Sequence, residues 1–210
     1  MEIEKSFHLT IMIKFLILFF FSLNVFAQND NLEKFLSNLN SFEANFVQEV
    51  KDFSNQIIDE SSGKVIFLKP NFFRWTYQVP SENEIISDGE FLYLYDPDLK
   101  QVIESRLDGQ LNMSPAMLLV SENIHEFFNT RLLNNSQNIM EFVAQPKNDE
   151  SAFFKQVIFI FNNNQLNIMK VLDNFDNLTT IKFHKIIQNK DINEAKFLFN
   201  YPDDIDVIKN

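Results

Sequence analysis

The stretch from Gly63 to Trp75, G-K-V-I-F-L-K-P-N-F-F-R-W, reads as two strands separated by a break at Lys69-Pro70. Because side chains alternate along a strand, Phe73, Trp75 and Tyr77 share one face of the second strand. This broad aromatic face lies beside a basic residue, and no catalytic constellation is nearby. The stretch therefore predicts a protein that holds an apolar ligand.

The composition of the chain limits what it can be. It has 210 residues, of which 45% are hydrophobic, enough for one domain with a substantial core. Its formal net charge of −11 argues against a nucleic-acid partner, which needs a basic surface. The absence of Cys excludes disulfides, thiolate metal sites and a lipidated Cys. With three Gly, a glycine-rich phosphate loop is also excluded.

The N-terminal region has the pattern of a secretory signal. The apolar run Phe15–Phe26 follows a Lys and ends beside a small residue, Ala27. The run is shorter than the ~20 residues with which a helix crosses a bilayer, which argues against a membrane anchor. We expect residues 1–27 to be a signal peptide, starting at the first Met or at Met12. Residues 28–210 should then form a single domain outside the cytoplasmic membrane.

The clearest helix signal covers Asp30 to Val50. Apolar residues recur there at steps of three and four, which places them on one stripe of a helix. They are Leu32, Phe35, Leu36, Leu39, Phe42, Phe46 and Val50. Asp30 fits the N-cap position, with Glu33 as its capping-box partner. The sequence therefore predicts one long N-terminal helix that buries this stripe.

From Phe53 onward the pattern is that of strands separated by turns. Asp88-Gly89 indicates a hairpin, and in the turns 162–164 and 173–177 Asn replaces Gly at positive φ. Such short connections make neighbouring strands antiparallel. The predicted strands are Gln56–Asp59, Gly63–Lys69, Phe72–Gln78, Glu84–Ser87, Phe91–Tyr95, Gln101–Ser105, Ile139–Ala144, Phe153–Phe161, Gln165–Leu172, Leu178–Ile187 and Glu194–Asn200.

The segment from Leu111 to Phe128 interrupts this series of strands. Ser114 fits an N-cap and Pro115 the first helical position, and Ser121 fits the cap of a second short turn. The segment is therefore predicted to be a short helical insert. It is either core packing or a lid over a cavity.

Patterns for catalysis and metal binding are missing from the sequence. His8, His125 and His184 have no partner at helical spacing and no acidic motif beside them, so surface or packing roles fit them better. Neither a G-x-S-x-G nor an H-E-x-x-H motif occurs. We expect no enzyme activity, no catalytic residues, no cofactor and no metal site, and we interpret the chain as a binding protein.

Six motifs, taken in their order and spacing, carry a family resemblance. They are L-N-S-F-E-A-N-F-V-Q-E-V (Leu39–Val50), S-G-K-V-I-F-L-K-P-N-F-F-R-W (Ser62–Trp75), I-I-S-D-G-E-F-L-Y-L-Y-D-P-D-L-K-Q-V (Ile85–Val102), S-P-A-M-L-L (Ser114–Leu119), L-D-N-F-D-N-L-T-T-I-K-F (Leu172–Phe183) and F-L-F-N-Y-P-D-D-I-D-V-I (Phe197–Ile208). No single motif is diagnostic. Together they span nearly the whole chain after the signal, which resembles the LolA family of periplasmic outer-membrane lipoprotein carriers of Gram-negative bacteria.

The resemblance implies a fold and a function. The fold would be mainly β with a helical lid (α+β): an unclosed, strongly curved antiparallel β half-barrel covered by the long N-terminal helix and the short insert. A hydrophobic cavity between them would take the acyl chains of acylated lipoproteins. An inner-membrane lipoprotein-releasing ABC transporter complex would hand the lipoprotein over, and an outer-membrane lipoprotein receptor would accept it. We expect the carrier to be a periplasmic monomer.

Candidate lining residues for this cavity come from the apolar faces of these elements. They are Leu36, Leu39, Phe42 and Phe46 from the helix, Phe73, Trp75, Leu92 and Leu94 from strands, and Met117 and Leu118 from the insert. Met suits an adaptable apolar surface. For each of these residues, ordinary core packing is the alternative.

The family resemblance also implies a lid latch at the Lys69-Pro70 turn. In the family, a basic residue before this Pro tethers the lid through hydrogen bonds to its backbone, and that residue is usually Arg. Lys69 provides a point charge with three donors in place of a planar fork, so we expect a looser or differently made latch. The alternative is a solvated charge at a strand end. Arg74 alternates with Trp75 and should face away from the cavity.

Other protein classes fit the sequence less well. An outer-membrane receptor of this fold needs a lipidated Cys, a stress sensor of this fold would carry a second domain, and a secreted hydrolase needs a nucleophile and a base. A structural β protein would not need so aromatic an interior. The alternative that stays open is another periplasmic lipid- or lipoprotein-binding protein of the same fold, acting as a sensor or scaffold.

Overall fold

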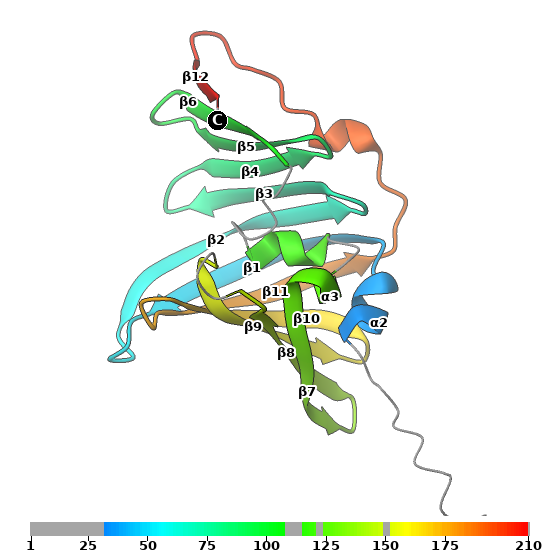
Figure 1. Ribbon diagram of the computed structural model, residues 1–210. Helices are drawn as coiled ribbons and strands as arrows, with labels where there is room; N and C mark the ends of the chain where they lie inside the picture. The colour runs from blue at the N-terminus through cyan, green and yellow to red at the C-terminus, as the bar shows by residue number, and fades with distance from the viewer. Residues whose placement is uncertain (1–31, 108–114, 121–123, 149–151, 210) are drawn as a thin grey trace, which may run out of the picture. The chain divides into compact units, whose positions relative to one another are not determined.

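A single curved sheet dominates the structure (Figure 1). The computed structural model describes residues 32–107, 115–120, 124–148 and 152–209. Within these residues twelve strands form the sheet, in the order β12-β6-β5-β4-β3-β2-β1-β11-β10-β9-β8-β7, so β12 and β7 are its edges and the sheet is unclosed. Neighbouring strands are antiparallel, except that β12 runs parallel to β6. The strands are β1 (Ser41–Lys51), β2 (Ile57–Leu68), β3 (Phe72–Val79), β4 (Asn83–Asp88), β5 (Phe91–Asp96), β6 (Gln101–Arg106), β7 (Phe128–Ser136), β8 (Ile139–Pro146), β9 (Phe154–Asn162), β10 (Gln165–Asp173), β11 (Leu178–Gln188) and β12 (Asp206–Lys209).

Among the described residues, three short helices cover one face of this sheet, called here the helix-covered face (Figure 1). They are α2 (Leu32–Ser37), η2 (Pro115–Leu119) and α3 (Ile124–Phe127). Their buried side chains, among them Leu36, Leu119 and Ile124, join those of the strands in one hydrophobic cluster. The predictions of a mainly β fold and of a helical insert are thus confirmed, whereas the predicted caps Ser114 and Ser121 lie outside the described residues. None of the described helices is long and apolar enough to cross a membrane.

The predicted long helix from Asp30 to Val50 is wrong. The helix α2 ends at Ser37, and the chain then enters β1, which pairs with β2 on one side and β11 on the other. Phe42, Ala44 and Phe46 are buried at every second position, as in a strand. Because Phe42 and Phe46 are four residues apart, they fit two strand periods as well as one helical step, so the apolar spacing alone did not separate the two structures.

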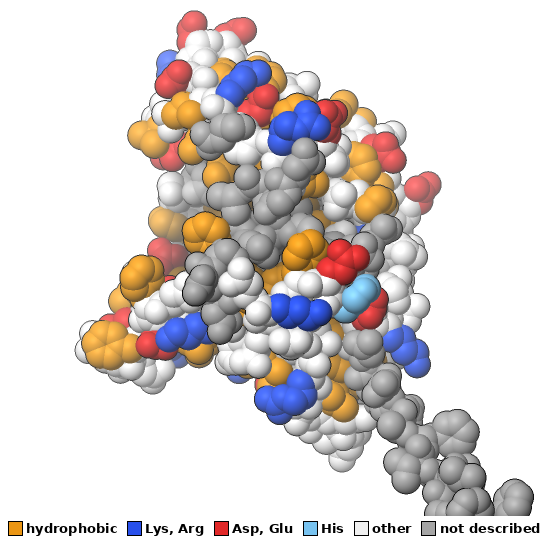
Figure 2. Space-filling model, in the orientation of Figure 1, with side chains coloured by type: hydrophobic (Ala, Val, Ile, Leu, Met, Phe, Trp, Pro, Cys, Tyr) orange, Lys and Arg blue, Asp and Glu red, His pale blue; other side chains and the backbone are white. Residues whose placement is uncertain are grey.

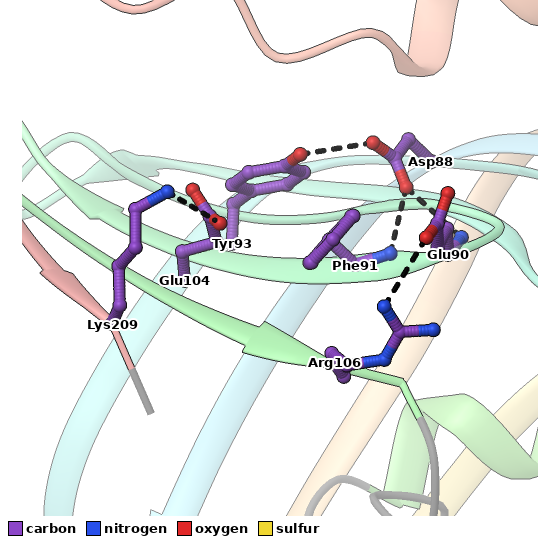
Figure 3. Close-up of polar contacts among 7 residues, drawn as sticks. All are labelled: Asp88, Glu90, Phe91, Tyr93, Glu104, Arg106 and Lys209. Carbon is purple, nitrogen blue, oxygen red and sulfur yellow. Dashed lines mark hydrogen bonds and ion pairs between the residues drawn. The ribbon is translucent and has the colours of Figure 1, made fainter.

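The predicted turns carry the backbone geometry that their residues favour. Gly89 has φ of 94°, and the Asp88 carboxylate accepts hydrogen bonds from the N–H groups of Glu90 and Phe91, which closes the β4–β5 hairpin (Figure 3). Asn163, Asn164 and Asp176 also have positive φ. These turns place most predicted strands within a few residues of their observed bounds, and the two predicted strands before Pro70 are one continuous strand, β2.

Three segments differ from the predicted strands. Strand β7 was not predicted, because this edge strand is largely exposed and its polar sequence, F-N-T-R-L-L-N-N-S, has little apolar alternation. The predicted strand Glu194–Asn200 is wrong, since its first half is the 3₁₀ helix η4 (Glu194–Phe197), whose cap Asn193 accepts a hydrogen bond from the Ala195 N–H. The short parallel strand β12 was also missed.

The C-terminal segment packs against the other face of β4, β5 and β6, called here the opposite face. Phe199 stacks on Tyr93 with ring centroids 5.0 Å apart. The Tyr201 hydroxyl donates a hydrogen bond to the Glu104 carboxylate. Figure 3 shows that this carboxylate also accepts a hydrogen bond, of 3.2 Å, from the Lys209 ammonium. Aromatic packing and one buried carboxylate thus attach this segment, leaving the helix-covered face to α2, η2 and α3.

This attachment should weaken in acid. The hydrogen bond from Tyr201 outweighs the effect of burial and holds the pKa of Glu104 below its usual 4.5, so the stabilisation is complete above that value and is lost as the pH falls through the lowered pKa. We expect Glu104→Gln to lower the thermal midpoint by about 2–4 °C at neutral pH and by less at about pH 3. Near-ultraviolet circular dichroism melts measure this, and a gap that persists undiminished in acid would contradict it.

Candidate functional site

An aromatic cluster occupies the middle of the helix-covered face. Phe46 on β1 lies with its ring centroid 4.4 Å from that of Trp75 on β3 and 5.4 Å from that of Tyr77. Phe73 and Phe183 lie 5.9 and 6.2 Å from Trp75. These side chains share one face because each strand alternates, and they come together because β3, β2, β1 and β11 are consecutive in the sheet. Trp75 is thus at the centre of the aromatic surface.

A half-open pocket of about 230 Å³ adjoins this cluster. Strands β1, β3, β4, β10 and β11 form its walls, and Pro115 of η2 borders it. Its lining consists of Gln48, Trp75, Tyr77, Ile85, Pro115, Met169, Val171, Thr179 and Ile181. A cavity of about 150 Å³ holds benzene, and drug-sized ligands need roughly 300–1,000 Å³. In the structure the helices α2, η2 and α3 lie on the sheet, which is called here the closed arrangement. In this arrangement the pocket admits a small apolar group and no long acyl chain.

A few polar atoms interrupt the apolar lining. The Tyr77 hydroxyl donates a long hydrogen bond of 3.4 Å to the Gln48 side-chain oxygen. Burial raises the pKa of Tyr77, while the neighbouring Gln48 and Trp75 side chains act in the opposite direction. The Trp75 indole nitrogen itself is buried within the pocket wall. The polar side chains of the pocket wall thus interact with one another.

The structure places the ten predicted lining residues in three kinds of position. Trp75 lines the pocket. Leu94 on β5 is 38% exposed, and the side chain of Met117 lies outside the described residues. The other seven are buried in the hydrophobic cluster between the sheet and the helices; they are Leu36, Leu39, Phe42, Phe46, Phe73, Leu92 and Leu118. In this closed arrangement those seven pack as core, and their role with a ligand stays a prediction.

Most residues that line the pocket were not predicted. Tyr77 shares a strand face with Phe73 and Trp75, so extending the alternation by one step identifies it. Gln48 follows Phe46 on the same face of β1, but only when that segment is understood as a strand. The residues from β10 and β11 are contributed by pairing across the sheet, for which the local sequence has no signal. Their identification required the structure.

Lys69 connects the sheet to the helix that covers it. Its ammonium donates a hydrogen bond of 2.6 Å to the backbone carbonyl of Leu36, near the C-terminal end of α2, where a cation is favourable. Its own N–H donates to the carbonyl of Asn40 over 2.8 Å. The Arg74 guanidinium instead donates a hydrogen bond to the carbonyl of Leu198, so Arg74 lies on the opposite face of the sheet. Its alternation with Trp75 predicted this position.

A second contact joins two of the covering helices to each other. The His125 imidazole on α3 lies 3.0 Å from the Glu33 carboxylate on α2. Both side chains are partly exposed, so the pair is a surface contact, consistent with the surface role predicted for His125. The contacts of Lys69 and His125 thus help to hold α2 in place, in addition to its apolar packing.

The outer end of the β1–β2 hairpin is apolar and exposed. Figure 2 shows hydrophobic side chains gathered there, away from the helices. Phe53 is 82% exposed and Ile58 57% exposed. The Asp52 carboxylate accepts hydrogen bonds from Ser54 and Gln56, which lower its pKa and fix the turn. Substitutions at this tip therefore lie outside the pocket.

Comparisons with known proteins agree with this architecture. Residues 37–200 match the family described as outer membrane lipoprotein carrier protein LolA. A relative from Nitrosospira multiformis is 35% identical over 179 residues, which cover 85% of this chain and 86% of the relative. A relative from Hahella chejuensis is also 35% identical, with 86% of this chain and 87% of the relative covered. Both relatives are named outer-membrane lipoprotein carrier protein. The chain therefore belongs to the LolA family.

Proposed function

We propose that this chain is a periplasmic chaperone that carries acylated lipoproteins from the inner to the outer membrane. It buries their acyl chains between the helix-covered face and the covering helices. The observation that supports this most directly is the half-open pocket, which has Trp75 in its wall and Pro115 of η2 on its border. The relatives named as carriers support the same function.

The closed arrangement suits a carrier that must also release its cargo. An acylated protein crosses water at a cost of about 0.8 kcal/mol for each exposed CH₂ group, so its chains need a cover. In the free protein the apolar side chains of the covering helices, such as Leu36 and Leu119, are buried against the sheet. Opening this cluster takes up part of the binding free energy, which keeps the affinity moderate and allows transfer.

The proposed partners follow from this cycle. Acylated lipoproteins occupy the opened cavity. An inner-membrane lipoprotein-releasing ABC transporter complex loads the carrier, and an outer-membrane lipoprotein receptor unloads it. The seven buried candidates, from Leu36 on α2 to Leu118 on η2, become acyl-chain contacts once the helices move away from the sheet. The carrier acts as a monomer and performs no chemistry on its cargo.

A charge placed in the pocket should abolish carriage. Ile85 on β4 lines the pocket and is only partly buried, so Ile85→Glu is expected to fold and to set a carboxylate against the acyl chain. Burying that charge is unfavourable, and we expect at least a tenfold loss of affinity for a fluorescent acyl probe. The same protein should fail to release lipoproteins from spheroplasts. Probe titration and immunoblotting of the released fraction measure the two effects.

The matched control is Ile58→Glu. Ile58 is 57% exposed on β2, and the change is chemically the same but lies outside the pocket. This variant should bind the probe and release lipoproteins as the unmodified protein does. If the unmodified protein shows no saturable binding of the acyl probe, or if both variants release lipoproteins normally, the proposed function is wrong.

A further inference from the structure

Three phenylalanine side chains are exposed at one end of the sheet. Phe53 is 82% exposed, Phe153 60% and Phe175 81%. Phe53 belongs to the β1–β2 turn, Phe153 to the segment just before β9, and Phe175 to the β10–β11 turn. These three side chains are called here the phenylalanine end; Ile58, on β2, is not part of it. Exposed apolar side chains that gather in one place mark a site for a protein or a membrane.

The pairing of the strands brings these three segments together. Lys51 at the end of β1 pairs with Leu178 at the start of β11, so the β1–β2 and β10–β11 turns leave the sheet at the same end (Figure 1). The side-chain amide of Asn174 donates a hydrogen bond of 2.7 Å to the carbonyl of Ala152, which precedes Phe153. The three rings thus come from distant parts of the sequence and lie on neighbouring segments.

Hydrogen bonds fix the turns that present two of these rings. The Asp52 carboxylate accepts hydrogen bonds from two backbone N–H groups of the β1–β2 turn. The Asp173 carboxylate does the same in the β10–β11 turn, where one of the two N–H groups belongs to Phe175. Fixed turns lower the entropy that is lost when a partner covers the rings. The rings are therefore positioned for binding before a partner arrives.

The phenylalanine end lies close to the pocket. Val171 on β10 and Thr179 on β11 line the pocket, and each is four residues from Phe175. At about 3.3 Å per residue along a strand, this separation is roughly 13 Å or less. A surface that covers the three rings therefore comes to lie beside the pocket.

The charges around the rings are mainly negative. Asp52, Asp173 and Asp176 lie in the two turns. Of the nearby cations, Lys51 is paired with a neighbouring glutamate over 2.9 Å, and Lys155 is paired with Asp176. Attraction to a negatively charged surface therefore does not explain this end, and burial of its rings remains as the driving force.

We propose that the phenylalanine end docks the carrier on the zwitterionic surface of a lipid bilayer, with its rings between the lipid head groups. A bilayer receives rings from separate turns without a preformed pocket for each one, which a protein partner has to supply. The choice of a bilayer rests on the proposed function, because the acyl chains of the cargo leave one membrane and enter another. Docking brings the pocket beside the lipid and shortens the path of an acyl chain through water.

Partition into vesicles measures this docking. The protein without its predicted signal peptide is mixed with phosphatidylcholine vesicles, and cosedimentation at increasing lipid concentration gives the partition coefficient. Phe53→Ser and Phe175→Ser each remove an exposed ring, so both variants are expected to fold. We expect each to lower the partition coefficient roughly 5- to 20-fold. Leu198→Ser, a control at a 54% exposed position outside the phenylalanine end, should keep it unchanged.

A fluorescent label reports which end of the sheet meets the lipid. Because the chain has no Cys, a single introduced Cys carries the only label. Gln56→Cys places an environment-sensitive NBD group in the β1–β2 turn, and Asn162→Cys places it at the other end of β9. With vesicles, we expect the emission of the first label to rise and to be quenched by spin-labelled lipids. The second label should keep its emission.

The outcomes separate the docking from the carrier function. Weaker partition of the two Phe variants, together with normal binding of the acyl probe, supports the docking. Equal partition of all variants, or no partition of the unmodified protein, overturns it, while saturable binding of the acyl probe leaves the carrier function intact. Partition that requires phosphatidylglycerol and is lost in salt also overturns it, since charge would then be the cause. If the rings instead join two copies of the chain, the variants change the sedimenting mass of the free protein, and the docking is wrong.

Discussion

Gly63→Ala is expected to destabilise the protein by roughly 3–5 kcal/mol, a large part of the 5–15 kcal/mol typical of a folded domain. A methyl group at Gly63 would lie 1.9 Å from the backbone carbonyl oxygen of Thr76. The obstacle is backbone of the neighbouring strand β3, so no side-chain rotation relieves it. Strands β2 and β3 would have to separate at the point where β2 shifts register between Ser62 and Gly63.

Thermal and urea denaturation measure this effect. A loss of this size lowers the thermal midpoint by roughly 6–20 °C for a chain of this length. The control is Lys64→Ala, one position further along β2, where the side chain is exposed and the change should stay within about 0.5 kcal/mol. Equal stability of the two variants would show that β2 and β3 adjust to the added methyl group.

The prediction at Gly63 also shows what the sequence reveals about this fold. Many strand ends elsewhere in the sheet were predictable, because residues such as Gly89, Asn163 and Asn164 favour positive φ and end the apolar runs. The close approach at Gly63 has no sequence signal of its own, since it arises between two strands. Local chemistry thus sets where strands end, whereas the contacts between strands require the assembled sheet.

The segment after Ser37 shows the limit of apolar spacing. Phe42 and Phe46 satisfy both periods, and the deciding residues are the ones between them: Ala44 is buried, while Asn45 and Val47 are not. As a strand, β1 also forms backbone hydrogen bonds with β2 on one side and β11 on the other. The spacing of apolar residues in the local sequence carries no information about this pairing. Tertiary pairing therefore outweighed a helical pattern.

The candidate site was predictable in its centre and not at its rim. Trp75 and Phe73 were identified because a strand alternates, and the structure brings both into the aromatic cluster. Composition could not separate core from lining, because in the closed arrangement Phe42 and Leu118 are both fully buried. With the helices lying on the sheet, the candidate lining residues and the packed core are the same side chains.

Lys69→Leu is expected to raise the affinity for an acyl probe roughly 10- to 100-fold and to impair transfer of lipoprotein to the receptor. The Lys69 ammonium holds the Leu36 carbonyl of α2 over 2.6 Å in the closed arrangement. A hydrogen bond that involves a charged group contributes about 1.5–3 kcal/mol, and Leu cannot form it. Without it the open arrangement is more populated, so the apparent affinity rises by the same factor.

Stronger binding is harmful here, because the receptor must compete with the carrier for the acyl chains. The variant should therefore release lipoproteins from spheroplasts and retain them when outer membranes with the receptor are added. Lys69→Arg is the control, since Arg keeps the charge and the donors and should preserve transfer. Unchanged probe affinity and normal transfer by Lys69→Leu would mean that Lys69 is only a charge at the end of β2. The closed free form would then depend on the apolar packing of α2 and on its contact with His125.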